Sequence, residues 1–185
     1  MQELLGKTVD KYKLQRLVGE GGMGAVFEAE HVFVGKRCAI KVLRPEFSGN
    51  QDVVKRMLRE AQTAAAIGHP NIVEAHDFGI ASDGTCYLIM DLLQGESLHE
   101  VLERIGRMDV TPTVAVALQV LSALVAAHAK GIVHRDLKPE NVFIAKSKMG
   151  GEVVKLLDFG ISKFMLAKED SLRLTKTGTV MGTPY

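Results

Sequence analysis

The first half of the chain alternates between apolar and polar positions in short runs that are separated by turn residues. Side chains of a β-strand point alternately to its two faces, so such runs predict strands. A break at Val34-Gly35-Lys36 predicts a hairpin turn, and Ser82-Asp83-Gly84 predicts a second one. The predicted strands are residues 12–19, 25–31, 37–43, 72–78 and 86–92.

The spacing of apolar positions changes to a helical period in three places. Residues 52–67 predict a helix that ends at Gly68, with a proline shortly beyond. Residues 97–105 predict a short helix. A third helix is expected from Thr111-Pro112 to about Lys130, because a capping residue before proline is a good helix start.

The remaining segments complete an α+β pattern. Two short apolar runs flank Met149-Gly150-Gly151 and predict a hairpin, whereas residues 161–185 are polar, threonine-rich and without a period, which predicts a loop. Five strands with one helix, followed by a mainly helical half, predict a two-lobed α+β fold.

Composition narrows the class of protein. The 185 residues include 23 basic and 22 acidic side chains, a net charge of +1 that favours neither nucleic acid nor an anionic membrane. Cys38 and Cys86 fit no metal or redox spacing and are expected to be buried free thiols of a reducing cytoplasm. The start of the chain does not resemble a signal peptide, and the apolar stretch 114–129 is too short and alanine-rich to predict a membrane span.

A glycine-rich segment, Gly19-Glu20-Gly21-Gly22-Met23-Gly24, lies between two predicted strands. Glycines let the backbone approach a phosphate without an intervening Cβ. Dinucleotide-binding folds use the same spacing, but there a helix follows, and here the next residues are strand-like. An ordinary glycine-rich hairpin remains the simplest alternative for this segment alone.

Two charged residues occupy apolar positions. Lys41 lies within Ala39-Ile40-Lys41-Val42-Leu43, which is apolar on both faces, and Glu60 lies on the apolar stripe of the helix 52–67. Because an unpaired buried charge is costly, each predicts the other as its partner. The alternative is that Glu60 pairs with Arg56 along the helix.

The most informative segment reads His134-Arg135-Asp136-Leu137-Lys138-Pro139-Glu140-Asn141, and Asp158-Phe159-Gly160 follows it. It supplies a possible proton acceptor and two possible magnesium ligands, a set that suits phosphoryl transfer. With the glycine-rich segment and Lys41, the chain resembles the eukaryotic-type protein kinases. The Lys-Pro-Glu stretch is similar to that of the serine/threonine branch of this family. The amino-acid sequences of the loops are similar to those of its bacterial members.

The resemblance implies a domain organisation and a set of cofactors. It implies a kinase N-lobe over residues 1–90 with a five-stranded antiparallel sheet and one helix, a hinge at 91–94, and a mainly helical, partial C-lobe over 95–185. It also implies ATP and Mg²⁺. The chain matches about the first two-thirds of a kinase catalytic domain and stops before the Ala-Pro-Glu-type motif, so we expect a fragment that is poorly stable and weakly active by itself.

The resemblance also assigns roles to residues of the catalytic segment. Asp136 would accept the proton of the substrate hydroxyl or orient that hydroxyl. Lys138 would neutralise charge on the transferring phosphoryl group. Asn141 and Asp158 would hold Mg²⁺ through oxygen. Lys41 and Glu60 would form the pair that orients the α- and β-phosphates. His134 is expected to be half-buried and structural, supporting Phe159.

Nucleotide binding would use the glycine-rich segment and an apolar adenine pocket. Met90 resembles the gatekeeper, and Asp91 to Leu93 the hinge whose backbone reads the adenine edge. For the apolar residues, ordinary core packing is the alternative. The implied binding residues are Val18, Gly19, Gly21, Gly22, Gly24, Val26, Ala39, Lys41, Met90, Asp91, Leu93, Phe143 and Leu157.

The resemblance implies regulation through the threonine-rich loop. Arg135 would bind a phosphorylated threonine, and Thr175 or Thr177 is expected to be autophosphorylated, although an unmodified, solvated loop is the alternative. Thr183 matches a substrate-positioning residue. Expected partners are proteins with serine or threonine hydroxyls and a second copy of the chain during autophosphorylation, without nucleic acid or a membrane segment in this part of the chain.

Two other functions compete with an ATP-dependent serine/threonine kinase of the cytoplasm. A non-catalytic kinase-like binding module is favoured by the expected loss of downstream helices, and disfavoured by the intact set Lys41, Asp136, Asn141 and Asp158. A small-molecule phosphotransferase of related fold is disfavoured by the Lys-Pro-Glu stretch and the threonine-bearing loop. A membrane anchor beyond residue 185 is compatible with all three.

Overall fold

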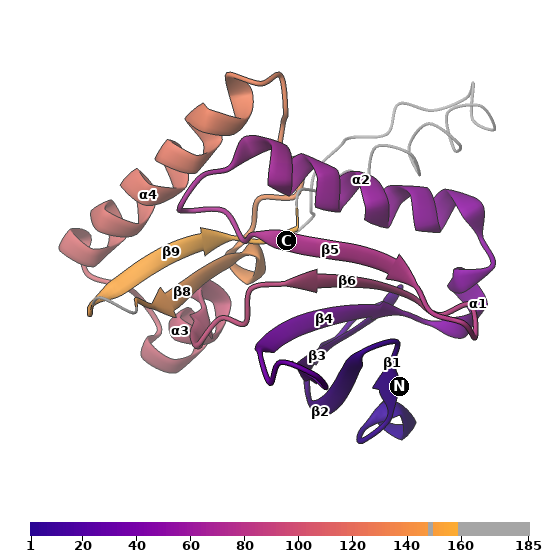
Figure 1. Ribbon diagram of the computed structural model, residues 1–185. Coiled ribbons are helices and arrows are strands. Elements are labelled where there is room, and N and C mark those ends of the chain that lie inside the picture. The colour runs from indigo at the N-terminus through magenta and orange to yellow at the C-terminus, as the bar shows by residue number, and fades with distance from the viewer. Residues whose placement is uncertain (148–149, 159–185) are drawn as a thin grey trace, which may run out of the picture.

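The computed structural model describes residues 1–147 and 150–158, apart from the side chain of Glu60. Its larger sheet has six antiparallel strands in the order β1-β2-β3-β4-β6-β5 (Figure 1). The count exceeds the predicted five because β1 is only two residues long, too short to show a period. The strands are β1 (Thr8–Val9), β2 (Tyr12–Glu20), β3 (Gly24–His31), β4 (Arg37–Leu43), β5 (Ala75–Ile80) and β6 (Cys86–Met90).

One long helix, α2 (Gln51–Ile67), packs on β5 and β6 (Figure 1). The Asn50 side chain accepts hydrogen bonds from two backbone N–H groups of the first turn, and Gly68 ends the helix in the left-handed conformation with φ +59°. The predicted end at Gly68 is therefore confirmed. Two shorter helices, η1 (Gln2–Leu4) and α1 (Pro45–Ser48), show no sequence periodicity and were not predicted.

The second sheet has three strands in the order β7-β8-β9 and lies beside α3 and α4 (Figure 1). β8 and β9 are the predicted hairpin strands, whereas the three-residue β7 was not predicted. A capping box between Ser97 and Glu100 starts α3. The elements are β7 (Gly95–Ser97), α3 (Leu98–Ile105), α4 (Val110–His128), η2 (Pro139–Asn141), β8 (Val142–Lys146) and β9 (Glu152–Leu156).

Several element boundaries differ from the sequence-based prediction. α4 begins at Val110, with Asp109 rather than Thr111 in the capping position. Pro112 then falls within the first turn, where a missing N–H removes no helical hydrogen bond. β5 begins at Ala75 rather than residue 72, and β6 ends at Met90 rather than residue 92.

A short segment before β5 joins the two sheets. Ile72 forms a parallel bridge with Leu156, and the Val73 N–H donates to the Leu156 carbonyl at 3.0 Å. The buried Asn71 side chain donates to the Val154 carbonyl at 2.8 Å and to Gln119 Oε1 at 2.9 Å. Gln119 belongs to α4 and also accepts from the Val154 N–H, so these polar groups connect α4, β9 and the segment after α2.

α4 is the most apolar helix of the described residues and is only partly covered. Ala123 and Ala127 are fully buried in a core shared with β9, while Leu118 is 62% and Leu121 56% exposed. Leu124 of the same helix is half-buried. This packing against β9 gives α4 its structural role in the domain.

The length and hydropathy of α4 would also allow it to cross a membrane. That is weak evidence, because core helices of soluble proteins meet the same test. The expectation that this part of the chain carries no membrane segment stays a prediction. The proposed lobes and the hinge at 91–94 stay predictions too; the larger sheet ends at Met90 and the smaller begins at Gly95.

Candidate active site

The predicted catalytic segment forms a hydrogen-bonded loop between α4 and β8. The Asn141 side-chain amide donates to the Asp136 carbonyl at 2.8 Å and to Asp136 Oδ2 at 3.2 Å. Lys138 Nζ lies 3.7 Å from the same Oδ2. Because its amide nitrogen is committed to Asp136, the side-chain oxygen of Asn141 is the atom that can accept a hydrogen bond or coordinate a cation.

His134 holds this loop against the end of β9. It is 2% exposed, more buried than the half-buried position expected. One ring nitrogen, Nε2, lies 2.9 Å from the Leu157 carbonyl, and Nδ1 accepts from the Asp136 N–H at 3.4 Å. The two contacts require the neutral Nε2–H tautomer. Burial, partly offset by the Leu157 contact and by Asp136, lowers the pKa of His134 below its ordinary value of 6.5.

Asp158 follows β9 and meets Lys41 of β4. Lys41 Nζ lies 3.3 Å from Asp158 Oδ1, although the two residues are 117 positions apart in the chain. Asp158 has φ +36°, a conformation that costs a non-glycine residue free energy and is concentrated at functional sites. The Leu157 N–H donates to the Asn141 carbonyl at 2.9 Å, so the residue before Asp158 is hydrogen-bonded to the catalytic loop.

The other predicted partner of Lys41 is Glu60. Its backbone belongs to α2, but its side chain lies outside the described residues, so the pairing with Lys41 and the alternative with Arg56 both stay predictions.

The glycine-rich segment forms the turn between β2 and β3. Arg44, just after β4, donates to Glu20 Oε1 at 2.9 Å and to the Gly21 carbonyl at 3.2 Å, which ties this turn to the sheet. Gly24 is required by packing, because a Cβ there would lie 2.3 Å from the Val42 carbonyl oxygen. A Cβ at Gly19 or Gly22 would meet no other described atom within 4 Å.

Strand register places much of the predicted adenine pocket on one sheet face. Val26 pairs with Lys41, and Ala39 pairs with Met90, so these four side chains share a face. A pocket of about 490 Å³ opens beside them and is lined by Val18, Leu92, Leu93 and Phe143, among others. Asp91 follows β6 and donates its N–H to the Glu74 carbonyl at 3.1 Å, and Leu157 follows β9.

The sequence analysis did not predict the charged residues that line this pocket. Glu28 of β3 is 5% exposed and is paired with Arg16 at 3.0 Å and with Arg37, and all three line the pocket with Glu100. One sequence signal was available, since Glu28 stands two positions after Val26 and interrupts the apolar run 25–29. Its two partners depend on strand register, including a shift between Leu14 and Arg16.

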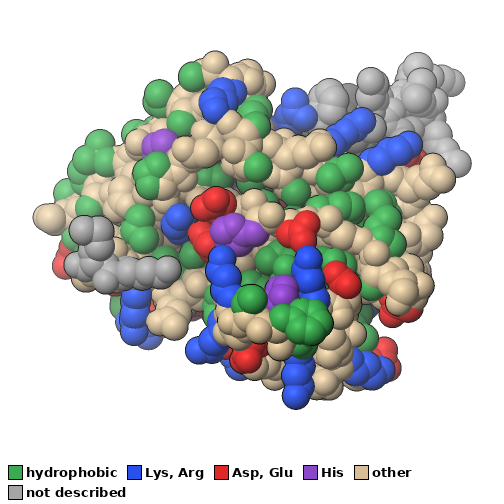
Figure 2. All heavy atoms as spheres, viewed as in Figure 1, with side chains coloured by type: hydrophobic (Ala, Val, Ile, Leu, Met, Phe, Trp, Pro, Cys, Tyr) green, Lys and Arg blue, Asp and Glu red, His purple; other side chains and the backbone are tan. Residues whose placement is uncertain are grey.

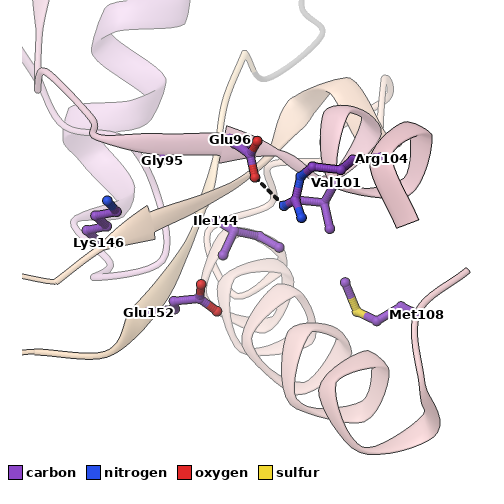
Figure 3. A pocket seen from close by; sticks show the side chains of 8 residues that line it. All are labelled: Gly95, Glu96, Val101, Arg104, Met108, Ile144, Lys146 and Glu152. Carbon is purple, nitrogen blue, oxygen red and sulfur yellow. Dashed lines mark hydrogen bonds and ion pairs between the residues drawn. The ribbon is translucent and has the colours of Figure 1, made fainter. Parts of the chain in front are cut away.

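A separate pocket of about 340 Å³ lies between α3, β7, β8 and β9 and contains none of the predicted site residues (Figure 3). An ion pair of 2.5 Å joins Glu96 and Arg104 on one side of it, and Lys146 and Glu152 project from the hairpin strands. Charges of both signs line this pocket.

Several predicted residues lie outside the described part of the chain. They are Thr175, Thr177 and Thr183, together with Phe159 and the predicted loop 161–185. Arg135, the predicted partner of phosphorylated Thr175 or Thr177, is described and has φ +64°. The regulatory and substrate-positioning roles stay predictions.

Comparison with known proteins shows the family of the chain. Residues 12–185 match the protein kinase domain family, and the chain belongs to that family. It is 42% identical over 183 residues to the serine/threonine-protein kinase pkn3 of Myxococcus xanthus, covering 98% of this chain and 34% of that protein. It is also 42% identical over 188 residues to the serine/threonine-protein kinase PknA of Mycobacterium tuberculosis, covering 99% of this chain and 42% of PknA.

Solved structures show the same fold. A double mutant of the PknI kinase domain of Mycobacterium tuberculosis superimposes with a TM-score of 0.69 at 31% identity, over 84% of this chain and 61% of that one. The apo form of PpkA-294 has a TM-score of 0.77 over 92% of this chain and 66% of its own, at 22% identity, a likeness of fold alone. The chain thus spans about a third to two-fifths of the curated relatives named above.

Proposed function

We propose that these residues form the ATP-binding and catalytic part of a serine/threonine protein kinase, which transfers a phosphoryl group from ATP to protein hydroxyls. One observation carries the proposal. Lys41, Asp136, Asn141 and Asp158 come from three segments of the chain and are joined through the 3.3 Å Lys41–Asp158 contact and the hydrogen bonds of Asn141. This is the residue set that phosphoryl transfer needs.

The glycine-rich turn fits the phosphates of a nucleotide. Within the described residues, Gly19 and Gly22 neither adopt a positive φ nor lie against packed atoms. Since neither backbone conformation nor packing requires glycine there, close approach of a ligand is the remaining physical reason for it. Lys41, 20% exposed at the side chain, would hold a phosphate oxygen.

The donor set also fits a hard divalent cation. Asp158 offers carboxylate oxygens and Asn141 an amide oxygen, the ligand type that Mg²⁺ prefers. When bound, Mg²⁺ would neutralise charge on the phosphates and fix their orientation. The bond from the Leu157 N–H to the Asn141 carbonyl would keep the two ligands near each other.

The chain's own groups would then act on the substrate. Asp136, 16% exposed at its side chain, would orient the substrate hydroxyl and accept its proton at a carboxylate oxygen. Lys138 would place positive charge near the transferring group. His134, neutral and buried, would act only by holding the Asp136 backbone.

Partners and location follow as further proposals. Protein substrates and a second copy of the chain would supply threonine or serine hydroxyls, and Arg135 would bind phosphorylated Thr175 or Thr177. Cytoplasmic location is supported by two buried free thiols, Cys38 and Cys86, whose pKa values are raised by burial. Phosphopeptide mapping after incubation with ATP tests the threonines, and phosphate found only outside residues 175–179 would contradict that assignment.

The decisive experiment compares two aspartate variants of the protein in its natural full length. Asp136→Asn should lower phosphate incorporation from Mg-ATP, into itself and into a basic protein, by about 100-fold or more. Asp109→Asn is the matched control: among the described residues, Asp109 makes no capping hydrogen bond with its side chain, and it should retain activity.

Other outcomes separate the competing functions. Equal incorporation in the Asp136→Asn variant would exclude the proposed role of Asp136. ATP binding without transfer to any protein would favour a kinase-like binding module. Transfer only to an aminoglycoside or choline would favour a small-molecule phosphotransferase.

A further inference from the structure

A cluster of three metal-ligating side chains lies outside the proposed active site. Glu74 precedes β5, His76 lies within β5, and Asp91 follows β6. One ligand atom from each residue lies within 4.8 Å of the other two. Figure 2 shows histidine and acidic side chains together at the surface over this end of β5 and β6.

The pairing of β5 with β6 brings these residues together. Ala75 pairs with Met90, so Glu74 and Asp91 are the next opposed positions, and the Asp91 N–H donates to the Glu74 carbonyl at 3.1 Å. Side chains alternate between the faces of a sheet. Glu74 and Asp91 therefore point away from the face that carries Met90 and the predicted adenine pocket.

A β-bulge adds the histidine to this pair. Ala75 and Asp77 pair with Met90 and Ile89, two consecutive residues of β6, so His76 is the extra residue on β5. Bulges redirect a side chain from its regular strand position. His76 Nε2 lies 2.8 Å from Asp91 Oδ1, and Nδ1 lies 4.0 Å from Glu74 Oε1.

We propose that Glu74, His76 and Asp91 bind a divalent transition-metal ion of the zinc class. One imidazole and two carboxylates suit Zn²⁺ better than Mg²⁺ or Ca²⁺, which prefer oxygen alone. Three protein ligands with a fourth position open to water are typical of zinc sites that are not purely structural.

The two distances involve different ring nitrogens of His76, whereas an ion would use only one of them. One ligand atom from each residue lies within 4.8 Å of the other two, so binding needs a movement of these side chains. Ligand atoms of a tetrahedral zinc site stand roughly 3.4 Å apart. The Glu74 side chain is 69% exposed and can rotate toward the ion, while His76 and Asp91, 28% and 35% exposed, are held by each other and by the sheet. A bound ion would join the start of β5 to the residue at which the chain leaves β6.

Zinc titration of the protein in its natural full length tests this site. The protein is stripped with a chelator, carries no polyhistidine tag and is kept in excess Mg²⁺ to occupy Asn141 and Asp158. Calorimetry should show a zinc site whose affinity falls by at least about 100-fold in His76→Gln. Glu74→Gln, which changes an exposed side chain, and Asp91→Asn should weaken the same site.

His99→Gln is the matched control, because His99 forms a histidine–carboxylate pair with Glu103 at 3.4 Å on α3 that has no third ligand in the described residues. It should leave zinc affinity unchanged. Co²⁺ should give the visible spectrum of a low-coordinate nitrogen–oxygen site in the parent and in His99→Gln, but not in His76→Gln. Unchanged affinity in both His76→Gln and Glu74→Gln, or no zinc binding by the parent, would overturn the proposal and leave the cluster as a surface ion pair.

Discussion

At the scale of single residues, the site combines positions that packing determines with positions that packing does not explain. Gly24 is glycine because the Val42 carbonyl occupies the position of a side chain, whereas Gly19 and Gly22 face open space among the described atoms. His134 is buried and neutral, while Asp136 beside it stays partly exposed. The same short motifs therefore contain residues with different physical duties.

The glycines lead to a prediction that separates stability from nucleotide binding. Gly24→Ala should destabilise the domain by about 1–3 kcal/mol, because the added Cβ meets backbone. Gly22→Ala should change stability by less than about 0.5 kcal/mol but weaken ATP binding. Thermal unfolding and nucleotide titration of both variants provide the measurements. If Gly22→Ala binds ATP as the parent does, the glycine is not there for a phosphate.

His134 predicts a dependence of stability on pH. Its pKa is lowered in the folded state, so the unfolded chain takes up the proton more readily. The stabilising contribution is complete above the ordinary pKa of 6.5 and is lost as pH falls from 6.5 toward the lowered folded pKa. Urea unfolding at pH 5 to 8 should show this loss in the parent and a shallower one in His134→Gln. An exposed-site control, His99→Gln, should keep the parent's slope.

At the scale of elements, the polar connection of α4, β9 and residues 71–73 keeps the catalytic loop attached to the larger sheet. Gln119 and Asn71 both bond to Val154, which is 1% exposed. Such bonds, made by side chains to a buried strand edge, fix the position of the strand that ends at Asp158.

Removing one member of this connection should have a measurable cost. Asn71→Ala removes the side-chain donor of the buried Val154 carbonyl and one of the two hydrogen bonds that Gln119 Oε1 accepts, and we expect a loss of roughly 1–3 kcal/mol. The midpoint of denaturant unfolding measures it. Asn50→Ala, which removes only a helix cap on α2, should cost about 1 kcal/mol and serves for comparison. An Asn71→Ala midpoint equal to that of the parent would show that water replaces both bonds.

Some elements and site residues could be predicted from the sequence, and others could not. Long periodic elements such as α2 and β4, and the motif residues Lys41, Asp136 and Asn141, follow from local pattern. β1 and β7 are too short to carry a period. The Arg16–Glu28–Arg37 group and the Glu74–His76–Asp91 cluster depend on bulges and strand register, which no run of residues reveals by itself.

At the scale of the whole molecule, α4 leaves apolar surface on one side of the described structure. Leu118 and Leu121 are more than half exposed, whereas Ala123 and Ala127, on the same helix, are fully buried against β9. An exposed apolar patch of this kind promotes association.

We predict that the 185-residue chain, prepared alone, binds a hydrophobic dye and self-associates. The double variant Leu118→Ser and Leu121→Ser should reduce both with little loss of stability, since each side chain is already largely in water. Dye fluorescence and light scattering are the measurements. Ala123→Leu, which overpacks the buried side, should instead destabilise the chain by about 1–3 kcal/mol. Equal dye binding by the parent and the serine variant would contradict this account.

Both ends of α2 are tied to neighbouring elements. Its last turn is fixed by Lys130, which donates to the carbonyls of Ala66 and Ile67, and by the bridge of Ile72 to β9. Its first turns are capped by Asn50 and packed into a buried cluster with β4 and β6. A movement of α2 would therefore disturb β4 and β9 together, and with them the ion pair between Lys41 and Asp158.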